Sequence, residues 1–187
     1  QPPRSRKELI IASSLTPKKL WFNPGEQAKI DRLRLLLEAE RFNAVRQRLQ
    51  QSGMRQGFAC LFYGSPGTGK TESVYQLARQ SGRDIMQVDI SETKSMWFGE
   101  SEKRIKEIFD RYRGYVRDCD PAPILLFNEA DAVLSCRRTT TGGSLDQTEN
   151  AMQNILLQEI ERLDGILIAT TNLTQNLDPA FDRRFLY

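Results

Sequence analysis

Short apolar runs alternate with segments of helical spacing along most of this chain. Between the runs, apolar residues recur every three or four positions, most clearly from Ile105 to Val116 and from Met152 to Leu163, which is the spacing of amphipathic helices. The runs have the length of buried strands and lie at 58–63, 84–89, 124–127 and 166–170. This alternation predicts an α/β domain in which helices flank a buried parallel sheet.

Three segments depart from that alternation. Residues 1–17 contain prolines and show no period, so we predict an N-terminal arm or linker there and the folded domain over 18–187. A helix start at Pro24 and the apolar positions after it predict one or two amphipathic helices that end at Gly53. The run RRTTTGGS at 137–144 has no apolar residue to anchor it, which indicates a mobile loop.

Composition excludes several classes of protein. No apolar run approaches the roughly 18 residues of a membrane span and the N-terminus lacks the apolar core of a signal peptide, so we expect a cytoplasmic protein without membrane contact. The 3 cysteines form no CxxC pair, and an odd number does not favour a disulfide framework. The chain has no histidine, which excludes imidazole zinc sites and histidine general bases and leaves that role to carboxylates and lysines.

The charge is unevenly distributed. Residues 1–56 carry 12 Lys and Arg against 5 Asp and Glu, whereas the rest carries 15 against 19. A basic N-terminal region can contact nucleic acid or an acidic partner, or it can consist of solvated helix faces, which is the interpretation we favour.

One glycine-rich segment carries a phosphate-binding motif. Gly64 to Thr71 reads GSPGTGKT, which matches G-x-x-x-x-G-K-[ST] and lies between a predicted strand and a predicted helix. Its backbone N–H groups are expected to surround phosphate oxygens, while Lys70 neutralises charge on them and the Thr71 hydroxyl ligates magnesium. The expected binding residues are Ser65, Pro66, Gly67, Thr68, Gly69, Lys70 and Thr71.

Polar residues end the next strand but one, over 124–131 (ILLFNEAD). Glu129 is the candidate to orient or deprotonate an attacking water, since no histidine is available. Asp131 either lies behind the site or caps the following helix, and we favour the cap. Asn128 stands where a carboxylate usually holds magnesium, commonly through water; its amide either weakens magnesium binding or is tolerated because Thr71 and the triphosphate supply most of the coordination.

Together with further segments in the same order, these motifs resemble the AAA family of ATPases, within the AAA+ class, from about Lys18 to Tyr187. The stretch 94–102 is similar to the first pore loop of the family, and 168–172 to its sensor-1 strand. The stretch 177–185 is similar to the end of its second region of homology. The resemblance assigns Trp97, Phe98 and Gly99 to gripping a polypeptide, Asn172 to sensing the γ-phosphate or positioning water, and Arg183 and Arg184 to the ATP of a neighbouring subunit.

Each of these assignments has a plainer alternative. Asn172 can be an ordinary turn residue, and Trp97 a core residue. Arg183 and Arg184, of which we favour Arg184 for the role in trans, can instead pair with Asp178 or Asp182 at the surface. The segment 137–144 is either a second pore loop or a plain connection.

The resemblance also implies a fold and an assembly. The fold is a P-loop NTPase with strand order 5-1-4-3-2, whose last strand and helical lid would fall beyond Tyr187. Trp21 to Gly25 would contribute to the adenine pocket. The assembly is a homo-oligomeric, hexameric ring that binds ATP and Mg2+ and needs the neighbour's arginine for hydrolysis.

Three functions remain open at this point. The first is a ring motor that remodels, unfolds or threads a polypeptide. The second is a nucleic-acid-directed ATPase, such as a loader or helicase-like motor, which would use the basic region. The third is a nucleotide-gated scaffold with weak hydrolysis, which Asn128 favours and Glu129, Asn172 and the paired arginines oppose.

Overall fold

A computed structural model describes residues 6–90, 101–135, 144–173, 175 and 177–186. Trp97, Phe98 and Gly99 lie outside the described residues, as does the polar run at 137–144 apart from its last residue.

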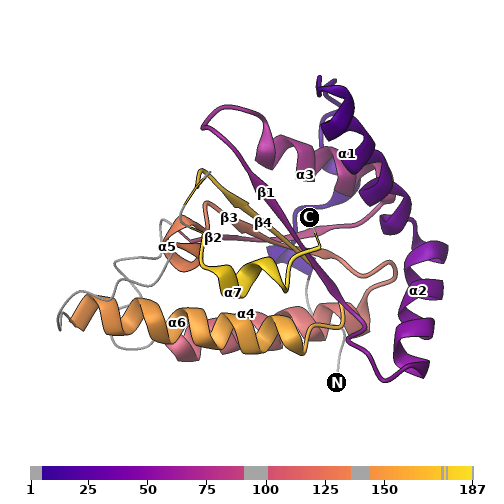
Figure 1. The fold of residues 1–187 in the computed structure, drawn as a ribbon. Coiled ribbons are helices and arrows are strands. Elements are labelled where there is room, and N and C mark those ends of the chain that lie inside the picture. Colours follow the sequence, from indigo (N-terminus) through magenta and orange to yellow (C-terminus); the bar gives the residue numbers. More distant parts are fainter. Residues whose placement is uncertain (1–5, 91–100, 136–143, 174, 176, 187) are drawn as a thin grey trace.

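The core of the molecule is a parallel sheet of four strands in the order β1-β4-β3-β2 (Figure 1). Ile166 of β4 pairs with both Phe58 of β1 and Ile124 of β3, and Ile124 pairs in turn with Ile85 of β2. The strands span Phe58–Tyr63 (β1), Ile85–Asp89 (β2), Ile124–Asn128 (β3) and Ile166–Thr171 (β4). The prediction of an α/β fold with a parallel sheet is confirmed, and the observed order is the 1-4-3-2 part of the expected one.

A further pairing lies on the outer edge of β1. Phe185 bridges to Ala59 in parallel, and the backbone N–H of Leu186 donates to the Ala59 carbonyl at 2.8 Å. This is the place of the expected fifth strand. The sequence placed that strand beyond Tyr187, whereas this pairing begins at Phe185, directly after Arg184.

Helices cover both faces of the sheet (Figure 1). One face packs against α1 (Pro24–Leu37), α2 (Ala39–Gln51) and α3 (Lys70–Ser81). The other packs against α4 (Ser101–Asp118), α6 (Ser144–Glu161) and the short α5 (Asp131–Leu134) and α7 (Pro179–Asp182). Alternate residues of each strand enter the two cores, which is why the strands appear in the sequence as continuous apolar runs.

The first helix starts where the sequence predicts. Asn23 caps it, because its side chain accepts from the Glu26 N–H at 2.8 Å while the Glu26 carboxylate accepts from the Asn23 N–H at 3.3 Å. This reciprocal pair satisfies two N–H groups that a helix start otherwise leaves open.

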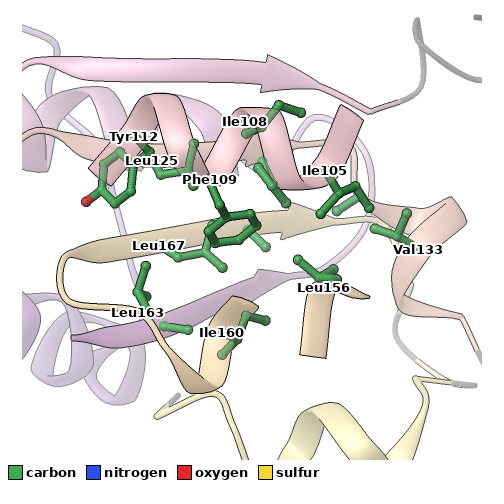
Figure 2. Close-up of a cluster of buried hydrophobic side chains, with 14 of the residues drawn as sticks. Ile105, Ile108, Phe109, Tyr112, Leu125, Val133, Leu156, Ile160, Leu163 and Leu167 are labelled. Carbon is green, nitrogen blue, oxygen red and sulfur yellow. The ribbon is translucent and has the colours of Figure 1, made fainter. Parts of the chain in front are cut away.

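The core between the sheet and α4 contains a fully buried phenol (Figure 2). The Tyr112 hydroxyl donates toward the carbonyls of Pro123, at 2.8 Å, and Ile166, at 3.0 Å, and accepts from the Ile166 N–H at 2.7 Å. Burial raises the pKa of Tyr112, so the hydroxyl stays protonated. This side chain links the starting ends of β3 and β4, whose other ends form the site described below.

The N-terminal segment that the sequence predicts to be an arm packs along the outer edge of β2. Ile10 pairs with Ile85 in antiparallel orientation through hydrogen bonds of 2.8 and 2.9 Å, and the Ala12 N–H donates to the Asp84 carboxylate at 2.9 Å. Leu9 and Ala12 are buried. The few apolar residues involved show no period, because a single bridge and two short 3-10 turns have none, and the sequence pattern therefore missed the contact.

The basic residues of α1 and α2 lie on their solvent-facing sides. Arg34 pairs with Asp31 at 3.6 Å and Arg41 pairs with Glu38 at 2.9 Å, each within three positions along the chain. Among the described helices, none is both long enough and apolar enough to cross a membrane.

Candidate active site

The glycine-rich segment forms a tight loop between the end of β1 and the start of α3. Gly67 and Gly69 have φ angles of +75° and +84°, a region that residues with a Cβ rarely adopt, and Gly69 directly precedes the helix. The loop therefore places backbone N–H groups at a helix N-terminus, where the helix dipole favours anions.

A pocket of about 340 Å3 opens beside this loop. The loop, the turn after β3 and the end of β4 contribute its walls, because parallel strands bring their carboxyl ends to one edge of the sheet. The lining residues are Pro66, Gly67, Gly69, Lys70, Thr71, Glu72, Glu129, Thr170, Thr171 and Asn172. Most of the binding and catalytic candidates identified in the sequence thus face one cavity.

Two of the loop candidates, Ser65 and Thr68, lie outside that lining and contact each other. The Thr68 hydroxyl donates to the Ser65 carbonyl at 2.8 Å. This bond closes the turn on which Gly67 and Gly69 sit.

Lys70 lies at the centre of the pocket wall. Its ammonium donates to the carbonyls of Gly64 and Ser65, both at 2.8 Å, and to the side-chain oxygen of Asn172 at 2.9 Å. The sequence predicts that both Lys70 and Asn172 act at the phosphates of the nucleotide, and the structure places their side chains in contact.

Asn128 contacts the residue that the sequence assigned to magnesium. Its side-chain oxygen accepts from the Thr71 hydroxyl at 2.7 Å and from the Thr170 hydroxyl at 3.0 Å. Hydroxyl and amide oxygens are the hard ligands that magnesium takes, directly or through water, so the residues present fit this ion. Compared with a carboxylate at position 128, the pair lacks one negative charge.

Glu129 has a backbone conformation that is rare for a residue with a side chain. Its φ is +54°, which costs on the order of 1–3 kcal/mol unless surrounding contacts fix it. One such contact is the bond from its own N–H to the Thr170 hydroxyl, at 3.1 Å. The exposed side chain borders the pocket.

The predicted helix cap at Asp131 is wrong. Ala130 occupies the cap position of α5 without a side-chain bond, and Asp131 is the first residue of the helix. Its carboxylate instead turns toward β4, where one oxygen accepts from the Thr171 hydroxyl at 2.5 Å and from the Asn172 N–H at 2.9 Å.

Thr170 and Thr171 are the site residues that sequence reasoning missed. Both are buried, and both use their hydroxyls on residues of the turn after β3. The available signal was two adjacent hydroxyl residues at the end of an otherwise apolar strand, but their partners depend on which strand lies beside β4.

The segment before α1 approaches the loop from the outside. A Cβ placed on Gly69 would lie 3.9 Å from Leu20, and the Lys18 ammonium pairs with Glu72 at 2.7 Å. The hydrogen bond from Lys18 lowers the pKa of the Glu72 carboxyl. Of the segment that the sequence assigned to an adenine pocket, Trp21 is 82% exposed, whereas Phe22 lines a second pocket together with Lys18 and Leu20.

Arg183 and Arg184 lie near the opposite end of β1 from the phosphate loop. Arg184 immediately precedes Phe185, which pairs with the second residue of β1, whereas the loop follows the last one. Five residues of β1 therefore separate the pairing of Phe185 from the start of the loop, a distance of roughly 16 Å at 3.3 Å per residue. Neither arginine is therefore placed to serve the loop of its own chain.

The two arginines differ in their surroundings. Among the described residues, the acidic partner of Arg184 is Glu161, not Asp178 or Asp182, and Arg184 also donates to the Ala180 carbonyl at 2.9 Å. Arg183 is exposed. The alternative of a surface pair with Asp178 or Asp182 is thus not what the structure contains for Arg184.

Comparison with known protein families shows which family the chain belongs to. The model of the ATPase family associated with various cellular activities (AAA) matches residues 60–186, which is more than half of the chain. The matched segment begins in β1 and includes the loop, the turn after β3 and the end of β4. Members of this family bind nucleotide, typically with Mg2+, and commonly form rings. The chain belongs to the AAA family of ATPases.

Proposed function

We propose that this chain is the ATP-binding and ATP-hydrolysing module of a ring-forming motor that remodels, unfolds or threads polypeptides. The observation that carries the hydrolytic part is the single pocket shared by the phosphate loop, Glu129 and Asn172. Each contributes a different requirement of phosphoryl transfer to water: charge neutralisation, a carboxylate base and an amide near the transferred group.

Binding of the triphosphate uses the loop and Lys70. The backbone N–H groups before α3 donate to the phosphate oxygens, and the Lys70 ammonium exchanges its bonds to the Gly64 and Ser65 carbonyls for bonds to the same oxygens. The Thr71 hydroxyl and, through water, Asn128 hold Mg2+, which when bound supplies charge neutralisation at the phosphates.

Hydrolysis depends on Glu129. A carboxylate at the pocket border orients the attacking water and accepts its proton, since the chain has no histidine to do so. Asn172 contacts Lys70, and we expect its amide to contact the γ-phosphate of a bound triphosphate.

Completion of the site needs a second copy. We infer that Arg183, rather than Arg184 as the sequence motif favoured, is the residue that reaches a neighbour's nucleotide, because it is exposed while Arg184 is engaged by Glu161. An arginine supplied in this way accelerates related phosphoryl transfers by roughly 10³ to 10⁵.

The assignment to polypeptide substrates rests on Trp97, Phe98 and Gly99. These residues lie between β2 and α4 in the sequence, and β2 ends at the same edge of the sheet as the nucleotide pocket. A stiff aromatic side chain in such a connection can grip a chain without reading its sequence.

A nucleic-acid-directed ATPase is the second candidate. The exposed basic residues of α1 and α2 favour it, but two of them, Arg34 and Arg41, already pair with acidic residues three positions away. The nucleotide-gated scaffold is favoured only by the missing charge at Asn128.

The deciding experiment measures ATP turnover of the assembled protein with unfolded polypeptide, with DNA and with neither. We expect stimulation by polypeptide, loss of that stimulation in Trp97→Ala and loss of all turnover in Glu129→Gln. Stimulation by DNA alone would favour the second candidate. Nucleotide binding without turnover would favour the scaffold.

A further inference from the structure

Asp131 is a carboxylate at the edge of the site that the proposed chemistry does not use. It begins α5, two residues after Glu129, and one of its oxygens accepts both from the Thr171 hydroxyl and from the backbone N–H of Asn172. The Thr171 hydroxyl accepts in turn from the Leu173 N–H at 3.1 Å. A single carboxylate thus holds the backbone at the point where the chain leaves β4.

The sheet does not hold this point by itself. Pairing of β4 with β3 extends only to Ala169, and pairing with β1 ends at Thr171. Asn172 therefore lies just past the last strand residue, where its backbone would be free to rotate. Its N–H bond to Asp131 removes that freedom and leaves its side chain in contact with Lys70 at 2.9 Å.

We propose that Asp131 is a positioning residue for Asn172, and that it sets the preference of the pocket for a nucleoside triphosphate over a diphosphate. It acts on the reaction only through Asn172. The turn from Asn128 to Asp131 then carries both the hydrolytic carboxylate and the anchor of the residue that contacts the terminal phosphate. The inference rests on the function proposed for this pocket.

The chemistry of the two bonds determines which variants are informative. Asp131→Ala removes the single oxygen that accepts both bonds, and the Asn172 N–H loses a charge-assisted bond. Asp131→Asn keeps a side-chain oxygen that can accept both bonds, although without the charge. Asp118→Ala, at the far end of α4, is the matched control, because within the described part of the chain its carboxylate pairs with the exposed Arg117 beside it.

The first measurement is a double-mutant cycle on turnover. We expect Asp131→Ala to lower kcat roughly 10- to 100-fold, the scale of a misplacement of about 1 Å, with KM for ATP changed less than about twofold. Asp131→Asn recovers part of the loss and Asp118→Ala has none. In an Asn172→Ala background, Asp131→Ala causes no further loss. An equal loss in both backgrounds would overturn the inference.

The second measurement does not need hydrolysis. The ratio of dissociation constants for ADP and for a slowly hydrolysed ATP analogue is compared between the wild type, Asp131→Asn, Asp131→Ala and Asn172→Ala. We expect the triphosphate preference to fall in Asp131→Ala to the level of Asn172→Ala and to be partly kept in Asp131→Asn. An unchanged ratio, or a wild type without any preference, contradicts the role of Asp131.

The two measurements separate the inference from the function on which it rests. A wild type that binds the triphosphate selectively but never turns it over contradicts the proposed hydrolysis, while the dissociation constants still test Asp131. Should Asp131→Ala fail to fold, the comparison of Asp131→Asn with the wild type, in both Asn172 backgrounds, decides between the outcomes.

Discussion

Asn128 leaves the metal end of the site one negative charge short. Its amide oxygen already accepts from two hydroxyls, those of Thr71 and Thr170, which is the full acceptor capacity of such an oxygen. A carboxylate in the same place would offer a second oxygen and a charge. Under the proposed function, we therefore expect this residue to limit the affinity of the pocket for Mg2+.

Asn128→Asp is expected to lower the Mg2+ concentration for half-maximal activity about 3- to 10-fold, because charge on the ligands sets the affinity of such sites. The measurement is a magnesium titration of ATP turnover at fixed ATP. Asn128→Ala serves as the comparison that removes the oxygen altogether. Identical half-saturation in Asn128→Asp and the wild type would show that position 128 does not limit the metal.

Thr170→Val is expected to lower turnover about tenfold or more and to destabilise the fold by roughly 1–3 kcal/mol. The valine has nearly the same shape but leaves the Glu129 N–H without its acceptor, and that N–H belongs to the residue with φ of +54°. The checks are steady-state kinetics and urea unfolding. Thr170→Ser keeps the hydroxyl and should retain most of the turnover and most of the stability. An equally inactive serine variant would argue against this bond.

At the residue scale, the sequence predicts which residues lie close together but not all of the hydrogen bonds that they form. Lys70 and Asn172 were expected in one pocket because a motif and a strand end place them there. The bonds of Thr170 and Asp131 could not be predicted, since they cross between strands that are distant in the chain. They depend on the strand order, which local patterns do not contain.

Among the elements, the strands were predictable and the N-terminal segment was not. Each strand has a continuous apolar run because both faces of a covered parallel sheet are buried. The segment around Ile10 contributes one bridge and two buried side chains, too little to leave a period in the sequence. Its place at the edge of β2 follows from unpaired backbone groups there, which the segment satisfies.

Ile10→Pro is expected to release this segment, because proline cannot donate the bond that Ile10 makes to the Ile85 carbonyl. The free energy of unfolding should fall by about 1–2 kcal/mol, and the amide of Ile85 should exchange faster with deuterium. Ile11→Pro is the matched control, since Ile11 has φ of −76°, which suits proline. Equal protection of Ile85 in both variants would mean that the bridge does not hold the edge.

Gly165→Ala is expected to destabilise the fold by about 1–3 kcal/mol, because a Cβ there would lie 2.4 Å from the Tyr112 hydroxyl oxygen. Urea unfolding measures the effect. In a Tyr112→Phe background the same change should cost less, since the nearest atom is gone. Equal costs in both backgrounds would place the clash elsewhere.

For the whole molecule, the main feature is that the phosphate loop and the paired arginines lie near opposite ends of β1. The family resemblance predicts a role in trans for the arginines, and the register of Phe185 with Ala59 supplies a physical reason for it. The sequence motif favoured Arg184, and it could not reveal the contact of Arg184 with Glu161, because Glu161 lies in α6, far from Arg184 along the chain.

Mixing Glu129→Gln with Arg183→Ala is expected to restore ATP turnover that neither variant has alone. A neighbour with an intact Arg183 completes the site of a copy with an intact Glu129, so some interfaces in the mixture contain both. Turnover of each variant and of the mixture, at constant total protein, is the measurement. A mixture no more active than the average of its parts would place the arginine in its own site, and a mixture of Glu129→Gln with Asp118→Ala reports the effect of dilution.

Because the length of β1 separates the loop from the arginine, closure of a ring would itself complete one more site for hydrolysis. In an open row of copies, each contact completes one site, and the copy at one end keeps a loop that no arginine reaches. A row of any length therefore has one silent site, and only closure of the row activates it. Under the proposed function, an assembly can thus distinguish a finished ring from a row lacking one member through its rate of hydrolysis alone.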